Sequence, residues 1–191
     1  MAIKPLMATI SAGKYKGKKI MLPSLESTRS TKGILKGSLF DTLQYDIVDE
    51  VFVEVFGGSG SMGLEALSRG AKHAYFIEKD KAAFGTLKSN CKVIDEAHTT
   101  PLYGDSFIIF PTLIPTFTCK AYFYFDPPFS IREGMEEIYV KVIDLIASIP
   151  PEKAHLIVIE HMSTLALPER IGAFGLQKTK KFGNSSLSYY M

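Results

Sequence analysis

The chain has 191 residues and is 46% apolar, 22% charged and 12% aromatic. These values predict a folded globular protein with a sizeable core and exclude collagen, a disordered tail and a disulfide-stapled miniprotein. The net charge of only +2 gives by itself no indication of a nucleic-acid partner. No apolar run approaches the roughly 20 residues that cross a bilayer, and the chain starts without a signal peptide. We therefore expect a cytoplasmic protein that does not contact a membrane.

The near-neutral total charge is the sum of two opposite regions. Residues 1–40 carry eight lysines and arginines against one acid, a net charge of +7, whereas the other 151 residues carry a net charge of −5. A basic segment on a mildly acidic body predicts contact between one end of the molecule and a polyanion. The alternative is a solvated hairpin whose lysines simply face water.

The first 45 residues are predicted to form a small basic extension, residues 1–45. Residues 8–12 and 18–22 read as short strands around a turn rich in glycine and lysine, which predicts a hairpin. Residues 31–45 carry apolar side chains at helical spacing, which predicts a helix despite the two glycines inside it.

The remaining residues, 46–191, are predicted to form one domain in which apolar strands alternate with helices. This alternation predicts a parallel sheet with helices on both faces. Residues 175–191 read as an antiparallel hairpin that turns at Gly183-Asn184. We expect the other strands at 51–56, 74–77, 99–103, 121–125 and 155–159, and helices at 61–69, at 80–91, from 106 and at 133–149.

A glycine loop between the first of these strands and the following helix is the first informative site. Gly58, Gly60 and Gly63 fit the pattern G-x-G-x-x-G, and Glu78 ends the next strand 20 residues after Gly58. A carboxylate at that position can accept hydrogen bonds from the ribose of an adenosine cofactor, so the spacing alone admits NAD or FAD. Glu54 argues against both, because a carboxylate in this turn repels a pyrophosphate and attracts a cation such as S-adenosylmethionine.

Asp105 follows the expected third strand, at the place where a doubly wound sheet meets the adenine of a nucleotide. Its carboxylate can accept a hydrogen bond from the adenine amino group. The alternative role is that of an N-cap for the helix that begins near Ser106, and one side chain can fill both roles.

The string Asp126-Pro127-Pro128-Phe129 is the most specific motif in the chain. It follows the apolar run 121–125, at the strand end where ligands bind in open α/β sheets. The prolines remove two N–H donors, so the Asp126 carboxylate and the Pro127 carbonyl can accept both hydrogens of an exocyclic amino group. This orients the nitrogen toward a methyl donor. Phe129 offers a ring for stacking on an extruded base.

These motifs together resemble the RsmD family of bacterial 16S ribosomal RNA guanine-N2 methyltransferases. Asp-Pro-Pro-Phe alone indicates only a methyltransferase that acts on amino groups. The family is indicated more specifically by the glycine loop, which runs into Leu-Glu-Ala-Leu-Ser-Arg-Gly-Ala. The chain departs from the family pattern at Ser30, Lys36 and Gly37, which concern RNA docking rather than cofactor binding. The matching segments cover nearly the whole chain and are residues 13–19, 29–31, 54–71, 77–80, 104–105, 126–129 and 181–190.

The resemblance implies a Rossmann-like class I methyltransferase fold: a mostly parallel seven-stranded sheet with helices on both faces, an antiparallel C-terminal hairpin and a small N-terminal hairpin and helix. It implies S-adenosylmethionine as methyl donor. The implied target is the 2-amino group of guanine 966 in 16S rRNA, free or in the assembling small subunit. We expect a monomer, which suits so large a substrate. The cofactor would be held by Glu54, Phe56, Gly57, Gly58, Ser59, Gly60, Glu78, Lys79, Asp105, Ser106 and Asp126. The guanine would be held by Asp126, Pro127, Pro128 and Phe129, and the RNA by Lys14, Lys16, Lys18, Lys19, Arg29, Thr31, Lys32 and Lys36.

The expected reaction is a direct in-line methyl transfer that leaves S-adenosylhomocysteine and needs no metal. Cys91, Cys119 and the four histidines accordingly show no metal-binding spacing. The sequence does not name the group that takes the proton released by the amine. Three alternatives stay open: an amino-methyltransferase acting on adenine N6 of DNA or on a protein glutamine amide, an NAD-dependent oxidoreductase, and a non-enzymatic RNA-binding module.

Overall fold

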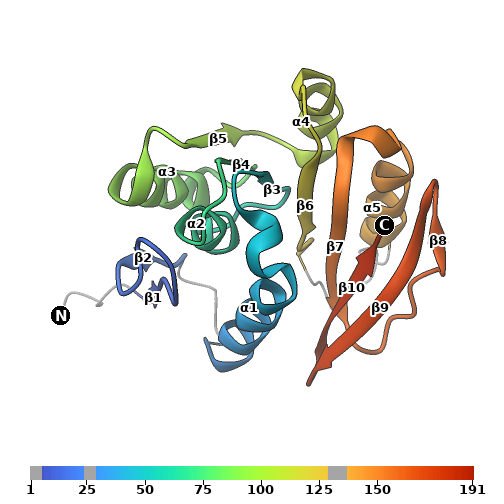
Figure 1. The fold of residues 1–191 in the computed structure, drawn as a ribbon, viewed down its shortest axis with the longest axis horizontal. Coiled ribbons are helices and arrows are strands. Elements are labelled where there is room, and N and C mark those ends of the chain that lie inside the picture. Colours follow the sequence, from blue (N-terminus) through green and yellow to red (C-terminus); the bar gives the residue numbers. More distant parts are fainter. Residues whose placement is uncertain (1–5, 24–28, 129–136) are drawn as a thin grey trace.

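The computed structural model describes residues 6–23, 29–128 and 137–191, the side chains of residues 29–31 excepted. Its main element is a sheet of eight strands among these residues (Figure 1). The strands are β3 (Val51–Glu54), β4 (His73–Glu78), β5 (Thr99–Tyr103), β6 (Ala121–Phe125), β7 (Ala154–Met162), β8 (Arg170–Ile171), β9 (Phe174–Phe182) and β10 (Ser185–Tyr190). They lie in the order β5-β4-β3-β6-β7-β10-β9-β8. The five strands from β5 to β7 are parallel, and the other three are antiparallel.

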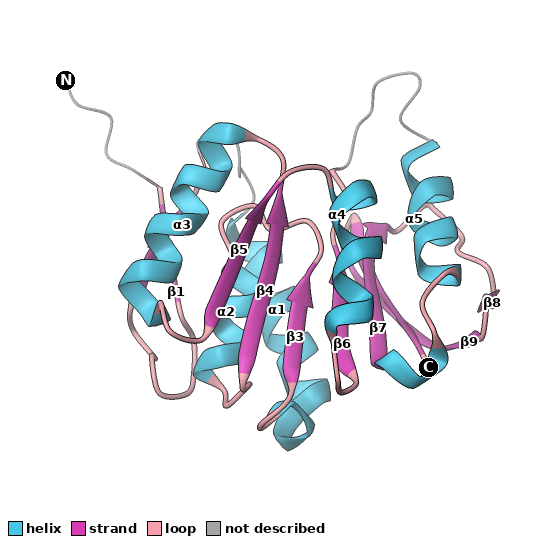
Figure 2. Cartoon of the chain, turned by 90° about the horizontal axis from the view of Figure 1, so that it is seen from above, coloured by secondary structure: helices cyan, strands magenta, loops and turns pink. Residues whose placement is uncertain are grey.

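Helices cover both faces of this sheet (Figure 2). Those in the described residues are α1 (Arg29–Leu43), α2 (Ser61–Ser68), α3 (Lys81–Asp95), α4 (Ser106–Leu113) and α5 (Glu137–Ala147). The helices α1, α2 and α3 pack on one face, and α4 and α5 pack on the other. Short 3₁₀ turns lie at Gln44–Ile47, Ile114–Thr116 and Pro151–Lys153. None of the helices described here is long and apolar enough to cross a bilayer.

The central strands are apolar throughout because both of their faces are buried. Phe52 and Tyr124 point into the core under α1 and α2, whereas Val53, Phe123 and Phe125 point into the core under α4 and α5. Successive side chains of a strand face opposite sides, so a strand between two helical layers needs apolar residues at every position. Because the five parallel strands run in the same direction, their carboxyl ends lie at one edge of the sheet.

The N-terminal segment shares the core of the main sheet. The strands β1 (Met7–Thr9) and β2 (Lys19–Met21) form a separate two-stranded sheet, which lies beside α2 and α3 (Figure 1). Ile10 and Ile20 of this hairpin are buried in the same cluster as Leu39 and Phe52. A Cβ on Gly13, at φ +83°, would lie 1.8 Å from the Ser68 carbonyl oxygen, so only glycine permits this approach. One hydrophobic core therefore includes residues of both predicted parts, 1–45 and 46–191. The division between them stays a prediction about function.

The expected Rossmann-like architecture is confirmed, although several bounds differ: β1, β2 and β3 are shorter than expected, and α3 continues to Asp95. An eighth strand exists because the two residues of β8 pair with β9, and so short a strand leaves no periodic pattern in the sequence. The strand expected at 155–159 runs from Ala154 to Met162, because the antiparallel partner β10 pairs with it as far as Met162. The first four residues of the helix expected at 133–149 lie outside the described residues.

Candidate active site at the carboxyl edge of the sheet

Each of the five parallel strands ends at or beside a carboxylate. Glu54 and Glu78 are the last residues of β3 and β4, Asp105 and Asp126 follow β5 and β6, and Glu160 lies near the end of β7. The first four line one cavity of about 950 Å³, which is large enough for a nucleotide-sized ligand. The five acids, from Glu54 to Glu160, are spread over more than 100 residues of the sequence. They come together because the strands that carry them are parallel and end at the same edge of the sheet.

Among the described residues, the cavity carries more acids than bases. The lining carboxylates in this part of the chain are Glu54, Glu78, Asp80, Asp105 and Asp126, and the lining ammonium groups are Lys32, Lys36 and Lys79. Two of these lysines are paired, because Lys36 lies 3.1 Å from Glu65 and Lys32 lies 2.7 Å from Asp126. The surplus of negative charge favours a cationic ligand over a phosphate.

The glycine loop has the backbone that its sequence predicts. Gly58 and Gly60 have φ values of +52° and +79°, in the left-handed region that suits glycine, and Gly60 is the residue before α2. Gly63 has another role, because a Cβ there would lie 2.3 Å from Cε1 of the buried Phe76. The loop therefore brings α2 close to β4 and exposes its backbone to the cavity.

Glu54 occupies the amino-terminal end of α2. The side chain is buried, and Oε2 accepts a hydrogen bond from the backbone N–H of Gly63 at 2.8 Å. In dinucleotide-binding folds, the N–H groups of this first helical turn bind the pyrophosphate. A carboxylate that already uses one of them excludes a second anion by repulsion and argues against the NAD alternative.

Glu78 is held in place by two backbone N–H groups. Oε2 accepts from Gly58 at 2.8 Å, and Oε1 accepts from Asp80 at 2.7 Å. Each carboxylate oxygen has a second lone pair, so the side chain can still accept hydrogen bonds from a diol. Lys79 lines the cavity beside it. The fixed carboxylate is consistent with the predicted ribose contact.

Asp105 is the N-cap of α4. Its Oδ1 accepts the N–H of Phe107 at 2.9 Å, while the residue also lines the cavity, so the two expected roles are compatible. Ser106 is buried and its hydroxyl donates to the carbonyl of Val55 at 2.5 Å, which ties α4 to the end of β3. Phe56 packs edge-on against Phe107 with ring centroids 5.8 Å apart.

Asp126 has a contact that its motif does not predict. Its Oδ2 accepts a hydrogen bond from Lys32 Nζ at 2.7 Å, and the same ammonium lies 3.3 Å from Oε1 of Glu160. The Tyr124 hydroxyl donates to Oε2 of Glu160. Partial burial opposes ionisation of Lys32, but the two carboxylates outweigh it and raise the pKa of its ammonium. Pro127 and Pro128 line the cavity, and Phe129 lies outside the described residues.

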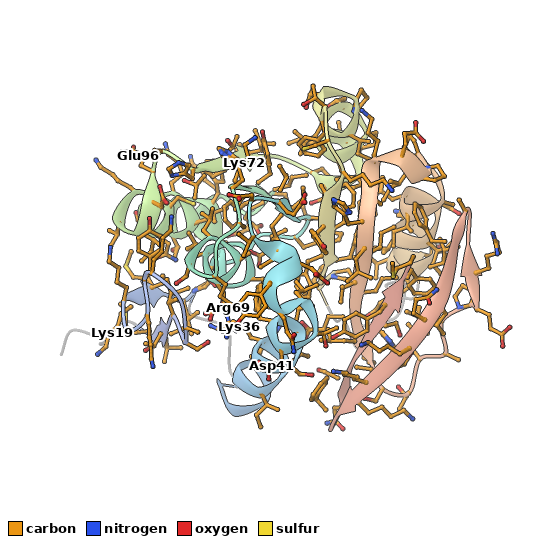
Figure 3. All side chains as sticks on the ribbon, in the orientation of Figure 1. Lys19, Lys36, Asp41, Arg69, Lys72 and Glu96 are labelled. Atoms are coloured by element: carbon orange, nitrogen blue, oxygen red, sulfur yellow. The ribbon has the colours of Figure 1, made fainter. Side chains whose placement is uncertain are left out.

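The basic residues of the extension fall into two groups. Lys14, Lys16, Lys18 and Lys19 are exposed on the hairpin around Tyr15, and Lys14 also lies 3.4 Å from Asp95. Figure 3 shows Lys19 at the outer end of the hairpin. The side chains of Arg29 and Thr31 are not among those described. A phosphate contact remains a prediction for all of these residues.

Lys36 lies inside the protein. It is 7% exposed, and Figure 3 shows it close to Arg69. Both side chains bind the fully buried Glu65, whose carboxylate also accepts hydrogen bonds from the Ser11 hydroxyl and backbone N–H. This placement gives Lys36 a structural role at the joint between α1, α2 and the hairpin, and does not present its ammonium to RNA.

Two important acids, Glu65 and Glu160, have no role in the sequence-based site. Glu160 carries the same signal as Glu54, an acid at the end of an apolar strand run, but the expected strand stopped one residue before it. Glu65 is not recognisable from the sequence, because Ser11 and Ala12 lie more than 50 residues away in the hairpin and Lys36 lies on another helix.

The described residues contain no group of three His, Cys, Asp or Glu side chains that could hold a metal ion. Burial raises the pKa of the Cys91 thiol to about 12, so this cysteine is a packing residue rather than a nucleophile. Cys119 is exposed.

Comparisons with known proteins agree with the fold. The model of the family described as "Conserved hypothetical protein 95" matches residues 8–191. The chain is 28% identical over 182 residues to "Putative rRNA methyltransferase YlbH" of Bacillus subtilis, covering 95% of this chain and 97% of the relative. It is 28% identical over 181 residues to "Ribosomal RNA small subunit methyltransferase D" of Escherichia coli, covering 95% and 88%. The solved structure "Putative methyltransferase yhhF from Escherichia coli" superposes with a TM-score of 0.77 at 24% identity, over 97% of both chains.

The mostly parallel sheet is the Rossmann-like fold, and the family match together with the relatives named as rRNA methyltransferases makes the chain a class I methyltransferase. Within that class, the family match over nearly the whole chain places the protein in the RsmD family.

Proposed function

We propose that this protein transfers a methyl group from S-adenosylmethionine to the 2-amino group of a guanine in 16S rRNA, guanine 966 by family resemblance. The observation that carries the proposal is a single cavity that joins Glu54, Glu78 and Asp105 to the Asp126-Pro127-Pro128 turn. The relatives that share the family are named as rRNA methyltransferases, which supports an rRNA substrate. The proposed enzyme acts as a monomer in the cytoplasm.

The acids of the cavity suit the proposed cofactor. Glu54, whose side chain lies beside the first turn of α2, would bind the ammonium group of the methionine part, and the fixed Glu78 carboxylate would accept hydrogen bonds from the ribose. Asp105 would receive the adenine amino group while it caps α4. The other loop residues expected at this site, Phe56, Gly57, Ser59 and Lys79, line the same cavity. When bound, S-adenosylmethionine supplies an electrophilic methyl group.

The proline turn would orient the amine. Asp126 and the Pro127 carbonyl would accept its two hydrogens, which turns the nitrogen lone pair toward the methyl group. The carboxylate also favours a pyramidal nitrogen, because the amine gains positive charge as the new bond forms. Phe129 would stack on the guanine.

The exposed lysines of the hairpin would hold RNA phosphates. Changing three of them to alanine is expected to weaken binding to small-subunit RNA and to lower the slope of log K against log salt by about 2 to 3. The affinity for S-adenosylhomocysteine should not change. The three positions are Lys16, Lys18 and Lys19, and a control triple variant at the exposed Lys72, Lys92 and Lys120 should keep the wild-type slope.

The function is tested with small ribosomal subunits from a strain that lacks this protein. Purified protein and labelled S-adenosylmethionine should place the label on one guanine N2 of the 16S rRNA, and Asp126→Ala should abolish this transfer. Label on duplex DNA or on a protein glutamine instead would assign one of the alternative substrates. Submicromolar binding of NADH without binding of S-adenosylhomocysteine would overturn the methyltransferase assignment.

A further inference from the structure

Two carboxylates lie side by side at the ends of adjacent strands. Phe125 of β6 pairs in register with Ile159 of β7, so Asp126 and Glu160 are the next residues of neighbouring parallel strands (Figure 1). Both follow the alternation that points Tyr124 and Val158 toward the face covered by α1. Asp126 is 23% exposed at its side chain, whereas Glu160 is only 1% exposed. The pair thus reaches from the cavity wall into the core.

Lys32 of α1 connects these carboxylates. Its ammonium is 2.7 Å from Asp126 and 3.3 Å from Glu160, so any N–H group in the place of Nζ meets both acids. The proposed function requires Asp126 to accept a hydrogen bond from the target amine. The amine and the Lys32 ammonium therefore compete for one position.

The groups that face Glu160 determine its proton affinity. Burial, followed by the negative charge of Asp126, raises the pKa of Glu160 to about 7, and Lys32 and Tyr124 act in the opposite direction. Among the described residues, Tyr139 of α5 also interacts with this carboxylate, and burial, then the charge of Asp126, raises the pKa of its hydroxyl. Displacement of Lys32 removes a positive charge and makes Glu160 a stronger base.

We propose that Glu160 accepts the proton that the target amine releases, and that Lys32 marks the position of this amine in the free protein. The inference rests on the proposed function and names a catalytic residue for it. The amine nitrogen forms its bond to the methyl carbon as the carbon–sulfur bond breaks, and the sulfur keeps that electron pair. The cationic amine keeps its hydrogen bond to Asp126, which stays ionised. Its other hydrogen, which the Pro127 carbonyl accepts before the transfer, is the proton that passes to Oε1 of Glu160.

Glu160→Gln is the first test, measured as single-turnover methyl transfer between pH 5.5 and 9. The wild-type rate should rise with pH through an inflection above 7, because the carboxylate must be unprotonated to act as a base and because displacement of Lys32 raises the pKa of Glu160 above its value of about 7 in the free protein. The variant should be at least tenfold slower at pH 8, should lose the inflection and should still bind S-adenosylhomocysteine. The matched control Glu152→Gln, at an exposed position, should keep the wild-type profile.

Tyr124→Phe gives a second, independent readout. It removes the hydrogen bond that lowers the pKa of Glu160, so the inflection should move to higher pH while the rate at high pH is retained. This shift decides the matter if Glu160→Gln does not fold. A wild-type rate and pH profile in Glu160→Gln, or an unshifted inflection in Tyr124→Phe, would overturn the inference. If the wild-type protein itself methylates no rRNA, it is the proposed function that fails.

Discussion

The substitution Glu54→Gln tests whether the Glu54 carboxylate binds the ammonium group of the cofactor, because it should leave the packing of the glycine loop unchanged. Glu54 is 5% exposed and ends β3, and its Oε2 accepts the N–H of Gly63 at 2.8 Å. A glutamine keeps the size and an oxygen that can accept this hydrogen bond, so the loop and α2 should fold as before. What disappears is one negative charge in the wall of the cavity.

The expected loss follows from the strength of hydrogen bonds to charged groups. Such a bond contributes about 1.5 to 3 kcal/mol, and 1.4 kcal/mol corresponds to a factor of ten in affinity. Glu54→Gln should therefore weaken binding of S-adenosylhomocysteine, which has the ammonium group, roughly 10- to 150-fold. Isothermal titration calorimetry measures this directly, with the exposed Glu96→Gln as a matched control.

A second ligand makes the test specific. Methylthioadenosine has the adenine, the ribose and the thioether but no amino-acid part, so its affinity should be the same in Glu54→Gln and in the wild type. Equal weakening of both ligands would mean that the substitution disturbs the loop rather than the ammonium contact. Wild-type affinity for both would refute the placement of the ammonium group at Glu54.

Two further substitutions test the joints around the site. Gly63→Ala should lower stability by about 1 to 3 kcal/mol, because its Cβ would meet the buried ring of Phe76, and thermal unfolding should show a Tm lower by about 2 to 4 °C for each kcal/mol. Gly85→Ala in α3, where a Cβ meets nothing within 4 Å, should instead leave the Tm unchanged or raise it. Lys36→Met should cost about 1.5 to 3 kcal/mol in denaturant unfolding at pH 7, because the buried Glu65 loses a charged partner. Burial opposes the shift, but Lys36 and the Ser11 hydrogen bonds lower the pKa of Glu65, so this cost should shrink as the pH falls below the ordinary glutamate value. A wild-type free energy of unfolding at pH 7 would refute the structural role of Lys36.

Most of the fold follows from local patterns. The strands β3 and β6 are predictable because burial on both faces requires an unbroken apolar run, and α1 forms despite Gly33 and Gly37 because Leu39 is fully buried under it. The short β8 and the full length of β7 are not predictable, because they depend on pairing with β9 and β10. The bounds of such strands depend on pairing with segments that are distant in the sequence. The periodicity of the residues within one strand does not reveal this pairing.

The candidate site likewise contains some residues that the sequence predicts and others that it does not. Glu54, Glu78 and Asp126 are predictable because an acid at the end of an apolar strand has one place to point in a parallel sheet. Glu160 shows the same pattern, because it directly follows the largely apolar run 155–159, but the sequence-based site does not include it. In the structure it lies inside β7, which continues to Met162. The link from Lys32 to both carboxylates crosses more than 90 residues and depends on the angle of α1, which no spacing in the sequence encodes.

The contacts of the basic residues in the extension show that its net charge is not all available to RNA. Three of its lysines face carboxylates of the protein: Lys14 at Asp95, Lys32 at Asp126 and Glu160, and Lys36 at Glu65. Only Lys32 and Lys14 can exchange their partner for a phosphate, because Lys36 is buried. The net charge of +7 therefore overstates the RNA contact, and the salt dependence of binding should reflect fewer phosphates than the eight basic residues suggest. If Lys32 binds an RNA phosphate as predicted, this contact would also release Asp126 and Glu160 for the amine, and RNA binding and catalysis would be linked through one side chain.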